Sequence, residues 1–481
     1  MNRRMVIYTI GQLIGVEAAV MMLPLCVSLI YGEGSWKAFL ITIGIAIVLS
    51  ALGLLLSRPK NHVIYAKEGF ATVALAWIIM SGIGALPFVI SGEIPNYIDA
   101  FFETVSGFTT TGSSIVRDVE ALSHGILFWR SFTHWLGGMG VLVFVMAILP
   151  SSSDRSIHLM RAEVPGPVVG KLVPKIKETA KILYLIYMVM TFIEVIFLLC
   201  GGMPLFDSLV HSFGTAGTGG FGIKADSIGG YSSYCQWVII IFMLLFGINF
   251  NLFYLCLIRR FKSVLKSEEL WAYLGIVLAA ATIITVNIMP IYNSLSQSIR
   301  LSAFQVASII TTTGYATADF NTWPVLSKGI LLILMFLGAC AGSTGGGFKI
   351  SRVVLLLKAV KREFHRLIHP RSRTTIRFEG KNVDEGTISG VECYLALYVI
   401  CFVSIFLILC FEKNFDIETN FSAAASCFNN IGPGLGSVGP ALNFADYSAV
   451  SKIVLSIAML LGRLELFPLI ITLAPSTWTK K

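Results

Sequence analysis

Ten apolar segments, each about as long as a bilayer is thick, recur from one end of the chain to the other. They cover residues 5–30, 38–56, 70–90, 127–149, 182–200, 237–257, 270–289, 325–341, 394–411 and 453–473. Crossing a hydrocarbon core of about 30 Å takes roughly 20 apolar helical residues. Charged residues make up only 13% of the 481, about half the share in a soluble domain. The sequence therefore predicts an all-α polytopic membrane protein and excludes a soluble enzyme.

Lys and Arg gather in a subset of the connecting segments. Of the 36 basic residues, 27 lie in the N-terminus, 58–67, 151–181, 259–269, 349–381 and the C-terminus. Basic loops are retained on the cytoplasmic side of a membrane, so we expect both termini to be cytoplasmic. The net charge of +9 then reflects topology and gives no support to nucleic-acid binding.

Four shorter apolar stretches, near residues 98–109, 205–216, 301–311 and 419–429, lie between particular pairs of these segments. About 10 residues form only ~15 Å of helix, so we expect re-entrant helices that enter and leave the membrane on the outer side. A unit of span, short helix, glycine turn and span then occurs four times around one pore. The predicted boundaries are 1–57 for an initial pair of spans and 58–165, 166–266, 267–382 and 383–481 for the four repeats.

A glycine-bearing turn follows each short helix. Irregular backbone at membrane depth is tolerated only where it is buried in protein or lines an aqueous cavity, so we expect the four turns to converge on one axis. Glycine lets a carbonyl point inward, and a ring of uncharged oxygens can replace the hydration shell of a monovalent cation. Glu103, Asp226 and Asp319 lie near the turns, where carboxylates would concentrate cations at the mouth. The predicted ion-binding residues are Thr110, Thr111, Gly112, Thr218, Gly219, Thr312, Thr313, Gly314, Asn430, Ile431 and Gly432.

The four turns, together with the glycine-rich run 338–349, resemble the Trk/Ktr/HKT superfamily of potassium transporters. With its initial pair of spans, residues 1–57, ahead of the four repeats, the chain resembles the TrkH branch of that superfamily. The resemblance implies potassium uptake across the cell inner membrane through a selectivity filter that faces outside, driven by the membrane potential. It also implies a homodimer in membrane lipid, with a cytoplasmic nucleotide-binding regulatory subunit of the TrkA type docked on the basic stretch 349–381. Potassium ions are expected at Thr111, Gly112, Thr218, Gly219, Thr313, Gly314, Ile431 and Gly432.

The glycine-rich run follows an apolar segment, and it does not match a nucleotide-binding P-loop because Phe348 separates Gly347 from Lys349. Two interpretations stay open: a helix-packing face, or a break in the inner helix, since each glycine destabilises a helix by ~1 kcal/mol. The resemblance implies an intramembrane gating loop. The residues assigned to the gate are Gly342, Ser343, Thr344, Gly345, Gly346, Gly347, Lys349 and Arg463.

Arg463 lies inside the last apolar segment. An intramembrane Arg costs at least ~2.5 kcal/mol unless it is paired or wet. One interpretation is an internal ion pair, with Glu465 as a candidate partner. The other, which the resemblance favours, is a positive gate that faces the pore beneath the filter.

Two other classes of function stay as alternatives. An intramembrane enzyme would need a Ser/His or paired-Asp arrangement in facing spans, and none stands out. His124, His134 and His211 lack metal-ligand spacing, so we expect structural roles for them. An ion-coupled secondary transporter with inverted repeats is disfavoured because the four predicted units share one orientation.

Overall fold

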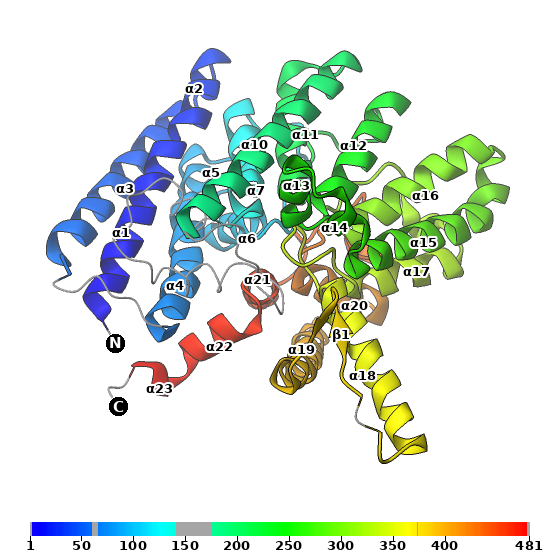
Figure 1. The fold of residues 1–481 in the computed structure, drawn as a ribbon. Coiled ribbons are helices and arrows are strands. Elements are labelled where there is room, and N and C mark those ends of the chain that lie inside the picture. Colours follow the sequence, from blue (N-terminus) through cyan, green and yellow to red (C-terminus); the bar gives the residue numbers. More distant parts are fainter. Residues whose placement is uncertain (1, 60–65, 141–175, 373, 479–481) are drawn as a thin grey trace.

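The computed structural model describes residues 2–59, 66–140, 176–372 and 374–478, and these fold almost entirely into helices (Figure 1). Among the described residues, six helical segments are long and apolar enough to cross a membrane, and a strongly bent helix pair could count as a seventh. Two of them are made of a pair of helices joined at one residue, Met21 or Ala85. The six are Arg3–Ile30 (α1, Arg3–Val20, with α2, Met22–Ile30), Trp36–Leu56 (α3), Glu68–Ser91 (in α4, Ala66–Gly84, with α5, Leu86–Ser91), Glu178–Cys200 (in α10, Ile176–Cys200), Glu268–Tyr292 (α15) and Glu385–Leu409 (α19).

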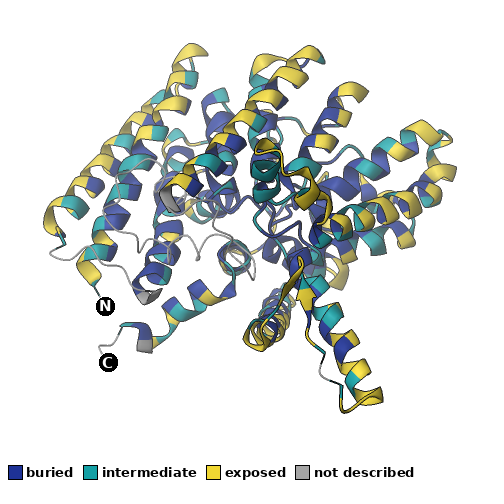
Figure 2. Ribbon diagram, in the orientation of Figure 1, coloured by how far each residue is buried: buried dark blue, intermediate teal, exposed yellow. Residues whose placement is uncertain are grey.

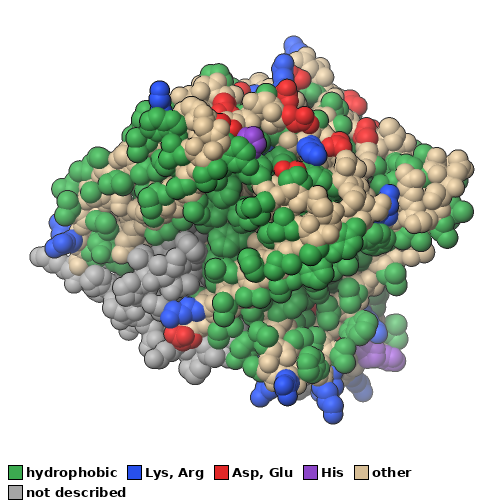
Figure 3. All heavy atoms as spheres, turned by 90° about the horizontal axis from the view of Figure 1, so that it is seen from above, with side chains coloured by type: hydrophobic (Ala, Val, Ile, Leu, Met, Phe, Trp, Pro, Cys, Tyr) green, Lys and Arg blue, Asp and Glu red, His purple; other side chains and the backbone are tan. Residues whose placement is uncertain are grey.

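These long helices expose large apolar side chains on one side and bury the other. In α3, for example, Leu40, Ile47 and Leu55 are exposed, whereas Phe39 and Ala46 are buried. Exposed residues follow the outward faces of the helices in Figure 2, and hydrophobic side chains cover much of the face in Figure 3. Such a surface is unfavourable in water and suits contact with lipid. The fold is therefore the polytopic helical membrane protein that the sequence predicts.

Four short helices, of 12 to 16 residues, lie inside this frame. Three of the four N-termini are fixed by local signals: Asn96, Ser294 and Asp416 each accept a hydrogen bond from a backbone amide of the first turn. Polar N-caps of this kind satisfy amides that a helix leaves unpaired. Their C-terminal halves are buried. The four helices are α6 (Tyr97–Phe108), α11 (Leu205–Gly217), α16 (Leu295–Ile310) and α20 (Ile417–Phe428).

The helices that follow three of the short helices, α11, α16 and α20, are interrupted. The pair α12 (Ser233–Phe246) and α13 (Phe250–Leu257) bends by 93°. α17 (Val325–Phe336) ends before the glycine-rich run, and α21 (Ala449–Arg463) ends at Arg463, two residues before α22 (Leu466–Leu473). The expectation of continuous spans over 237–257, 325–341 and 453–473 is therefore wrong. The corresponding segment 127–149 begins in α7 (His124–Gly138), and its second half lies outside the described residues.

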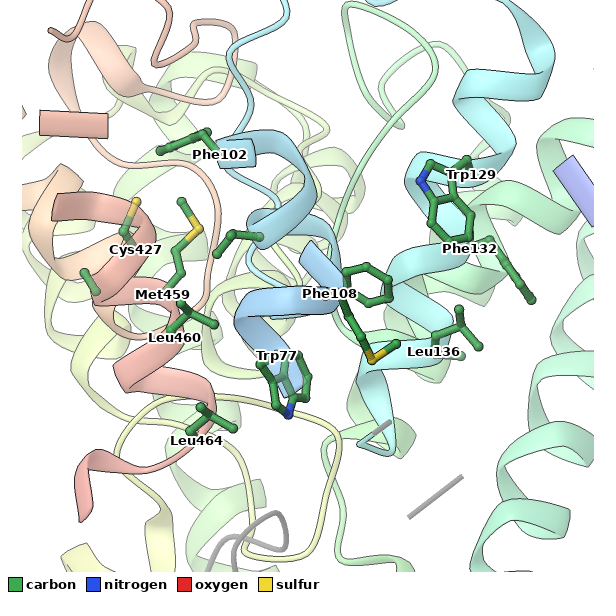
Figure 4. Packing of buried hydrophobic residues seen from close by; sticks show 14 of the residues in the cluster. Trp77, Phe102, Phe108, Trp129, Phe132, Leu136, Cys427, Met459, Leu460 and Leu464 are labelled. Carbon is green, nitrogen blue, oxygen red and sulfur yellow. The ribbon is translucent and has the colours of Figure 1, made fainter. Parts of the chain in front are cut away.

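The core lies where the short helices meet their neighbours. Figure 4 shows Trp77 of α4, Phe108 of α6, Trp129 of α7 and Leu460 of α21 in one buried hydrophobic cluster. Phe108 and Trp129 are in edge-to-face contact, with ring centroids 6.0 Å apart. This packing holds the C-terminal ends of the short helices in place, and the glycine turns begin there.

The remaining elements are one longer helix, a hairpin and several short helical segments. α18 (Ile350–Ile368) carries most of the basic stretch and projects from the bundle (Figure 1). A hairpin follows it, with β1 (Arg377–Phe378) antiparallel to β2 (Lys381–Asn382). The other short elements are α14 (Phe261–Leu265), η1 (Phe320–Thr322), η2 (Gly436–Val438) and α23 (Pro475–Trp478).

Candidate functional site

The four glycine turns share one backbone conformation. We define them as residues 110–112, 218–220, 312–314 and 430–432. Each starts with a non-glycine residue at φ of 54–57°, and each ends with a glycine at φ of 76–105°. The middle residue donates its N–H to the carbonyl five residues earlier, at 2.8–2.9 Å. The first residues are Thr110, Thr218, Thr312 and Asn430; the middle ones are Thr111, Gly219, Thr313 and Ile431; the last are Gly112, Gly220, Gly314 and Gly432.

This conformation changes the register of the second turn by one residue. The predicted ion-binding residues include Gly219 and omit Gly220, but the backbone gives Gly220 the position of Gly112 and gives Gly219 the position of Thr111. Two adjacent glycines offer no local signal for which of them takes the left-handed conformation. Gly219 stays in the turn as its middle residue.

The last glycine of each turn lies against the next turn. A Cβ added there would come within 1.9–2.8 Å of a carbonyl oxygen, far inside any real contact. For Gly112, Gly220, Gly314 and Gly432 that oxygen belongs, in order, to Gly219, Thr313, Ile431 and Thr111. The contacts therefore run from the first turn to the second, third and fourth and back to the first. The four turns form a closed ring, and only glycine fits at its four junctions.

A buried ion pair contacts the backbone just after each of the first two turns. Arg130 Nε lies 2.5 Å from Glu103 Oε1, and both side chains are almost fully buried. Glu103 also accepts from the Ile115 amide at 2.9 Å, and Arg130 donates to the Gly222 carbonyl at 2.9 Å. The guanidinium lies 3.7 Å from the centre of the Phe221 ring. The expectation that Glu103 concentrates cations at the mouth is therefore wrong, because its carboxylate is buried and its negative charge is neutralised by Arg130.

Arg130 is a functional residue that the sequence patterns above did not single out. The available signal was its position inside the apolar segment 127–149, since an ionisable residue at membrane depth is costly and usually has a specific partner. His134 plays a related part. Its Nδ1 lies 2.8 Å from the Gly107 carbonyl, and its Nε2 accepts from the Phe221 amide at 3.3 Å. One nitrogen donates and the other accepts, so the imidazole is neutral and connects the end of α6, before the first turn, with the residue after the second turn.

Two side-chain oxygens at the start of the turns are buried without a hydrogen-bond donor among the described residues: Thr110 Oγ1 and Asn430 Oδ1. The amide nitrogen of Asn430 donates to Thr111 Oγ1 and to the Met459 carbonyl, both at 2.9 Å. These two bonds fix the orientation of the Asn430 amide and leave its Oδ1 without a donor among the described residues. Buried oxygens without a donor are costly in a dry interior, and a dehydrated cation would satisfy them.

The run 338–349, called the gate loop below after the role that the resemblance implies for it, lies directly against the ring. The Gly346 amide donates to Thr312 Oγ1 at 2.6 Å, and a Cβ on Gly346 would lie 2.7 Å from the Asn429 carbonyl. The loop also fills the bend between α12 and α13, where Cys340 donates to the Gly247 carbonyl at 3.1 Å. It is irregular rather than helical, so the interpretation as a helix-packing face is wrong.

Arg463 connects the gate loop with α7. Its guanidinium donates to the Thr344 carbonyl at 2.7 Å, to the Gly138 carbonyl at 2.6 Å and to the Gly137 carbonyl. Glu465, the candidate partner from the sequence, forms an ion pair with Arg352. Lys349 donates to the Gly345 carbonyl within the loop. The structure thus brings the predicted turn residues and the predicted gate residues into one contiguous site.

Comparison with known proteins agrees with this arrangement. The family model TrkH, described as a cation transport protein, matches residues 35–480. The Trk system potassium uptake protein TrkH of Salmonella typhimurium is 36% identical over 485 residues, which cover 99% of this chain and all of that protein. The protein TrkG of Escherichia coli, also named a Trk system potassium uptake protein, is 33% identical over 480 residues, covering 99% of this chain and 98% of TrkG.

A solved structure shares the fold as well. The crystal structure of the potassium transporter TrkH from Vibrio parahaemolyticus superimposes with a TM-score of 0.89 at 34% identity, and the match covers both chains completely. Full-length identity above 30%, together with a family match over most of the chain, confirms the resemblance seen in the sequence. The chain belongs to the TrkH family, a family of cation transport proteins and not of enzymes.

Proposed function

We propose that this protein takes up potassium ions across the cell inner membrane through the ring of four glycine turns. The observation that carries the proposal is the closed cycle of glycine-to-carbonyl contacts, because it gathers four sets of uncharged backbone oxygens around one axis. Neutral oxygens suit a monovalent cation better than a divalent one. The relatives named above as potassium uptake proteins supply the choice of ion. Potassium is then the transported substrate and not a resident cofactor.

The proposed ligands are oxygens of the turns. They include the eight positions expected from the sequence, with Gly220 added because it takes the place of Gly112 in the second turn: Thr111, Gly112, Thr218, Gly219, Gly220, Thr313, Gly314, Ile431 and Gly432. Thr110 Oγ1 and Asn430 Oδ1 would add side-chain oxygens at the inner end, where the short helices stop. The membrane potential provides the driving force, worth ~2.3 kcal/mol per charge for each 100 mV.

The gate in this proposal is the gate loop together with Arg463. The loop lies across the start of the turns, and Arg463 holds it to the end of α7. A fixed positive charge beside the pathway raises the energy of a passing cation. Opening would need the loop and the guanidinium to move apart.

The surroundings of the pore belong to the same proposal. The four repeats 58–165, 166–266, 267–382 and 383–481 would surround the pathway, with the filter facing outside and both termini cytoplasmic. The basic helix α18 would then lie on the cytoplasmic side, where a nucleotide-binding subunit of the TrkA type is the proposed partner. The exposed apolar faces would contact lipid and a second copy of the chain.

The test is electrical recording from purified protein in bilayers, with potassium, sodium and proton gradients varied independently. A reversal potential that follows the potassium gradient supports an uncoupled potassium pathway. One that follows a sodium or proton gradient favours the ion-coupled transporter. Absence of current and of rubidium uptake, with the regulatory partner present, would overturn the proposal.

A further inference from the structure

We propose that the β1–β2 hairpin is a cytoplasmic latch that holds the gate loop in place, with Glu379 and Glu269 as its positioning residues. The inference rests on the proposed role of the gate loop, and it concerns what keeps that loop closed. Neither carboxylate belongs to the turns or to the gate residues predicted from the sequence.

Glu269 fastens both ends of the gate loop. Its Oε1 accepts from the Ala341 amide at 2.7 Å and from the Ser351 amide at 3.0 Å. Ala341 lies at the start of the loop, and Ser351 lies in the first turn of α18, just after it. Glu269 is only 5% exposed. One buried oxygen therefore pins the entry and the exit of the loop to the N-terminus of α15.

Glu379 fastens that same N-terminus to the hairpin. Its Oε1 accepts from Ser267 Oγ at 2.9 Å and from the Glu269 amide at 3.1 Å. Ser267 is the N-cap of α15, so a second carboxylate sits at a helix N-terminus, where the helix dipole favours negative charge. The backbone amide of Glu269 and its side chain thus connect the hairpin to the loop through a single residue.

The backbone at Glu379 supports a functional reading of this contact. Glu379 and Gly380 form the two-residue connection of the hairpin, with φ of 51° and 74°. Tight connections with both φ values positive favour Asn, Asp and Gly, and a glutamate there is uncommon. Strained positions of this kind persist where the surrounding contacts require them. Here the contact is the pair of hydrogen bonds to α15.

The hairpin is also attached to the elements that flank the loop. Lys358 of α18 donates to the Arg377 carbonyl at 2.7 Å and forms an ion pair with Glu268 of α15. Ile376 packs with Leu355 of α18 and Ile388 of α19 in a small buried cluster. A displacement of the hairpin or of α18 on the cytoplasmic side would therefore pull on α15 and on the loop together. Loss of the Glu379 bonds would loosen the N-terminus of α15 and, through Glu269, weaken one attachment of the loop.

The experiment compares Glu379→Gly with the unmodified protein by hydrogen–deuterium exchange in lipid nanodiscs. Glycine removes the acceptor and relaxes the backbone at φ 51°, so the hairpin itself stays favourable. The control is Glu385→Ala, which removes an exposed carboxylate on the same side that pairs with Arg362. We expect peptides covering 338–351 to exchange at least ~10-fold faster in Glu379→Gly, and at an unchanged rate in Glu385→Ala. Glu269→Gln is the second variant and should give a smaller increase.

Rubidium uptake is measured on the same samples. Faster exchange with higher uptake supports the latch and the gate together. If Glu379→Gly exchanges faster but neither it nor the unmodified protein takes up rubidium, the latch is supported and the proposed function is contradicted. Unchanged exchange at 338–351 in Glu379→Gly, or the same increase in Glu385→Ala, would overturn the latch.

Discussion

At the scale of single residues, the site depends on four positions where no side chain fits. Gly112, Gly314 and Gly432 could be found from the sequence, because each follows a short helix in a recognisable turn. The fourth, Gly220, could not be separated from Gly219, since both are glycines and only the folded backbone distinguishes them. The local sequence pattern therefore located the second turn but misplaced its last glycine by one residue.

Gly220→Ala tests that register. An added Cβ would lie 2.0 Å from the Thr313 carbonyl, and alanine at φ 76° carries ~1 kcal/mol or more of strain. We expect rubidium uptake to fall at least ~10-fold, since each ~1.4 kcal/mol of barrier is tenfold in rate. The matched control is Gly222→Ala, whose Cβ would meet nothing closer than 3.5 Å. Equal uptake by Gly220→Ala and Gly222→Ala would show that Gly220 does not form part of the pathway.

Arg463→Ala tests the gate. The substitution removes a positive charge and the three hydrogen bonds that join the gate loop to α7. We expect uptake to rise, by about tenfold for each ~1.4 kcal/mol that the guanidinium adds to the barrier. Arg463→Lys keeps the charge, cannot reach all three carbonyls, and should give a smaller rise. Unchanged or lower uptake by folded Arg463→Ala would exclude Arg463 from the gate.

At the scale of elements, hydropathy predicted where helices lie but not where they break. Glycines lie near the ends of two of these helices: a Cβ on Gly137 of α7 would lie 1.9 Å from the Phe108 carbonyl oxygen, and one on Gly462 of α21 would lie 2.1 Å from the Phe428 carbonyl oxygen. Both helices thus end where they pack against the end of a short helix. A window average over 20 apolar residues cannot register such a contact, because it depends on a partner distant in sequence.

The buried ion pair between Glu103 of α6 and Arg130 of α7 leads to a prediction for stability. Glu103→Ala leaves the Arg130 guanidinium buried without its carboxylate, and breaking a buried pair on one side typically costs ~3–5 kcal/mol. We expect a large fall in the thermal unfolding midpoint in detergent. Arg117→Ala is the control, because the Arg117–Asp446 pair is mostly exposed and should be worth no more than ~1 kcal/mol. Similar midpoints for the two variants would contradict a supporting role for the buried pair.

At the scale of the whole molecule, composition and charge distribution were enough to predict the class of protein. The mutual placement of the repeats was not, because it depends on contacts between residues far apart in the chain. Asn430 donates to Thr111 across 319 positions, and Lys452 pairs with Asp99 across 353. Each of these residues is polar and unremarkable in its local sequence. Only the closed arrangement of four turns makes them neighbours.

That closed arrangement predicts that the transported ion stabilises the fold. The ring holds oxygens from four distant segments close together, and their mutual repulsion is relieved when a cation lies between them. A ligand that binds only the folded state stabilises it by RT ln(1 + [L]/Kd), which is ~2.7 kcal/mol at 100 times Kd. We therefore expect a higher unfolding midpoint in potassium chloride than in N-methyl-glucamine chloride at equal ionic strength, because the organic cation is too large to enter.

The same variants decide whether this stabilisation comes from the ring. Gly220→Ala should lower the midpoint in both salts and lose the difference between them, since its Cβ displaces the Thr313 carbonyl. Gly222→Ala should keep the difference, and general effects of salt on the surface would act on both variants alike. If the unmodified protein unfolds at the same temperature in both salts, or if Gly220→Ala retains the full potassium effect, the ring is not where the ion binds.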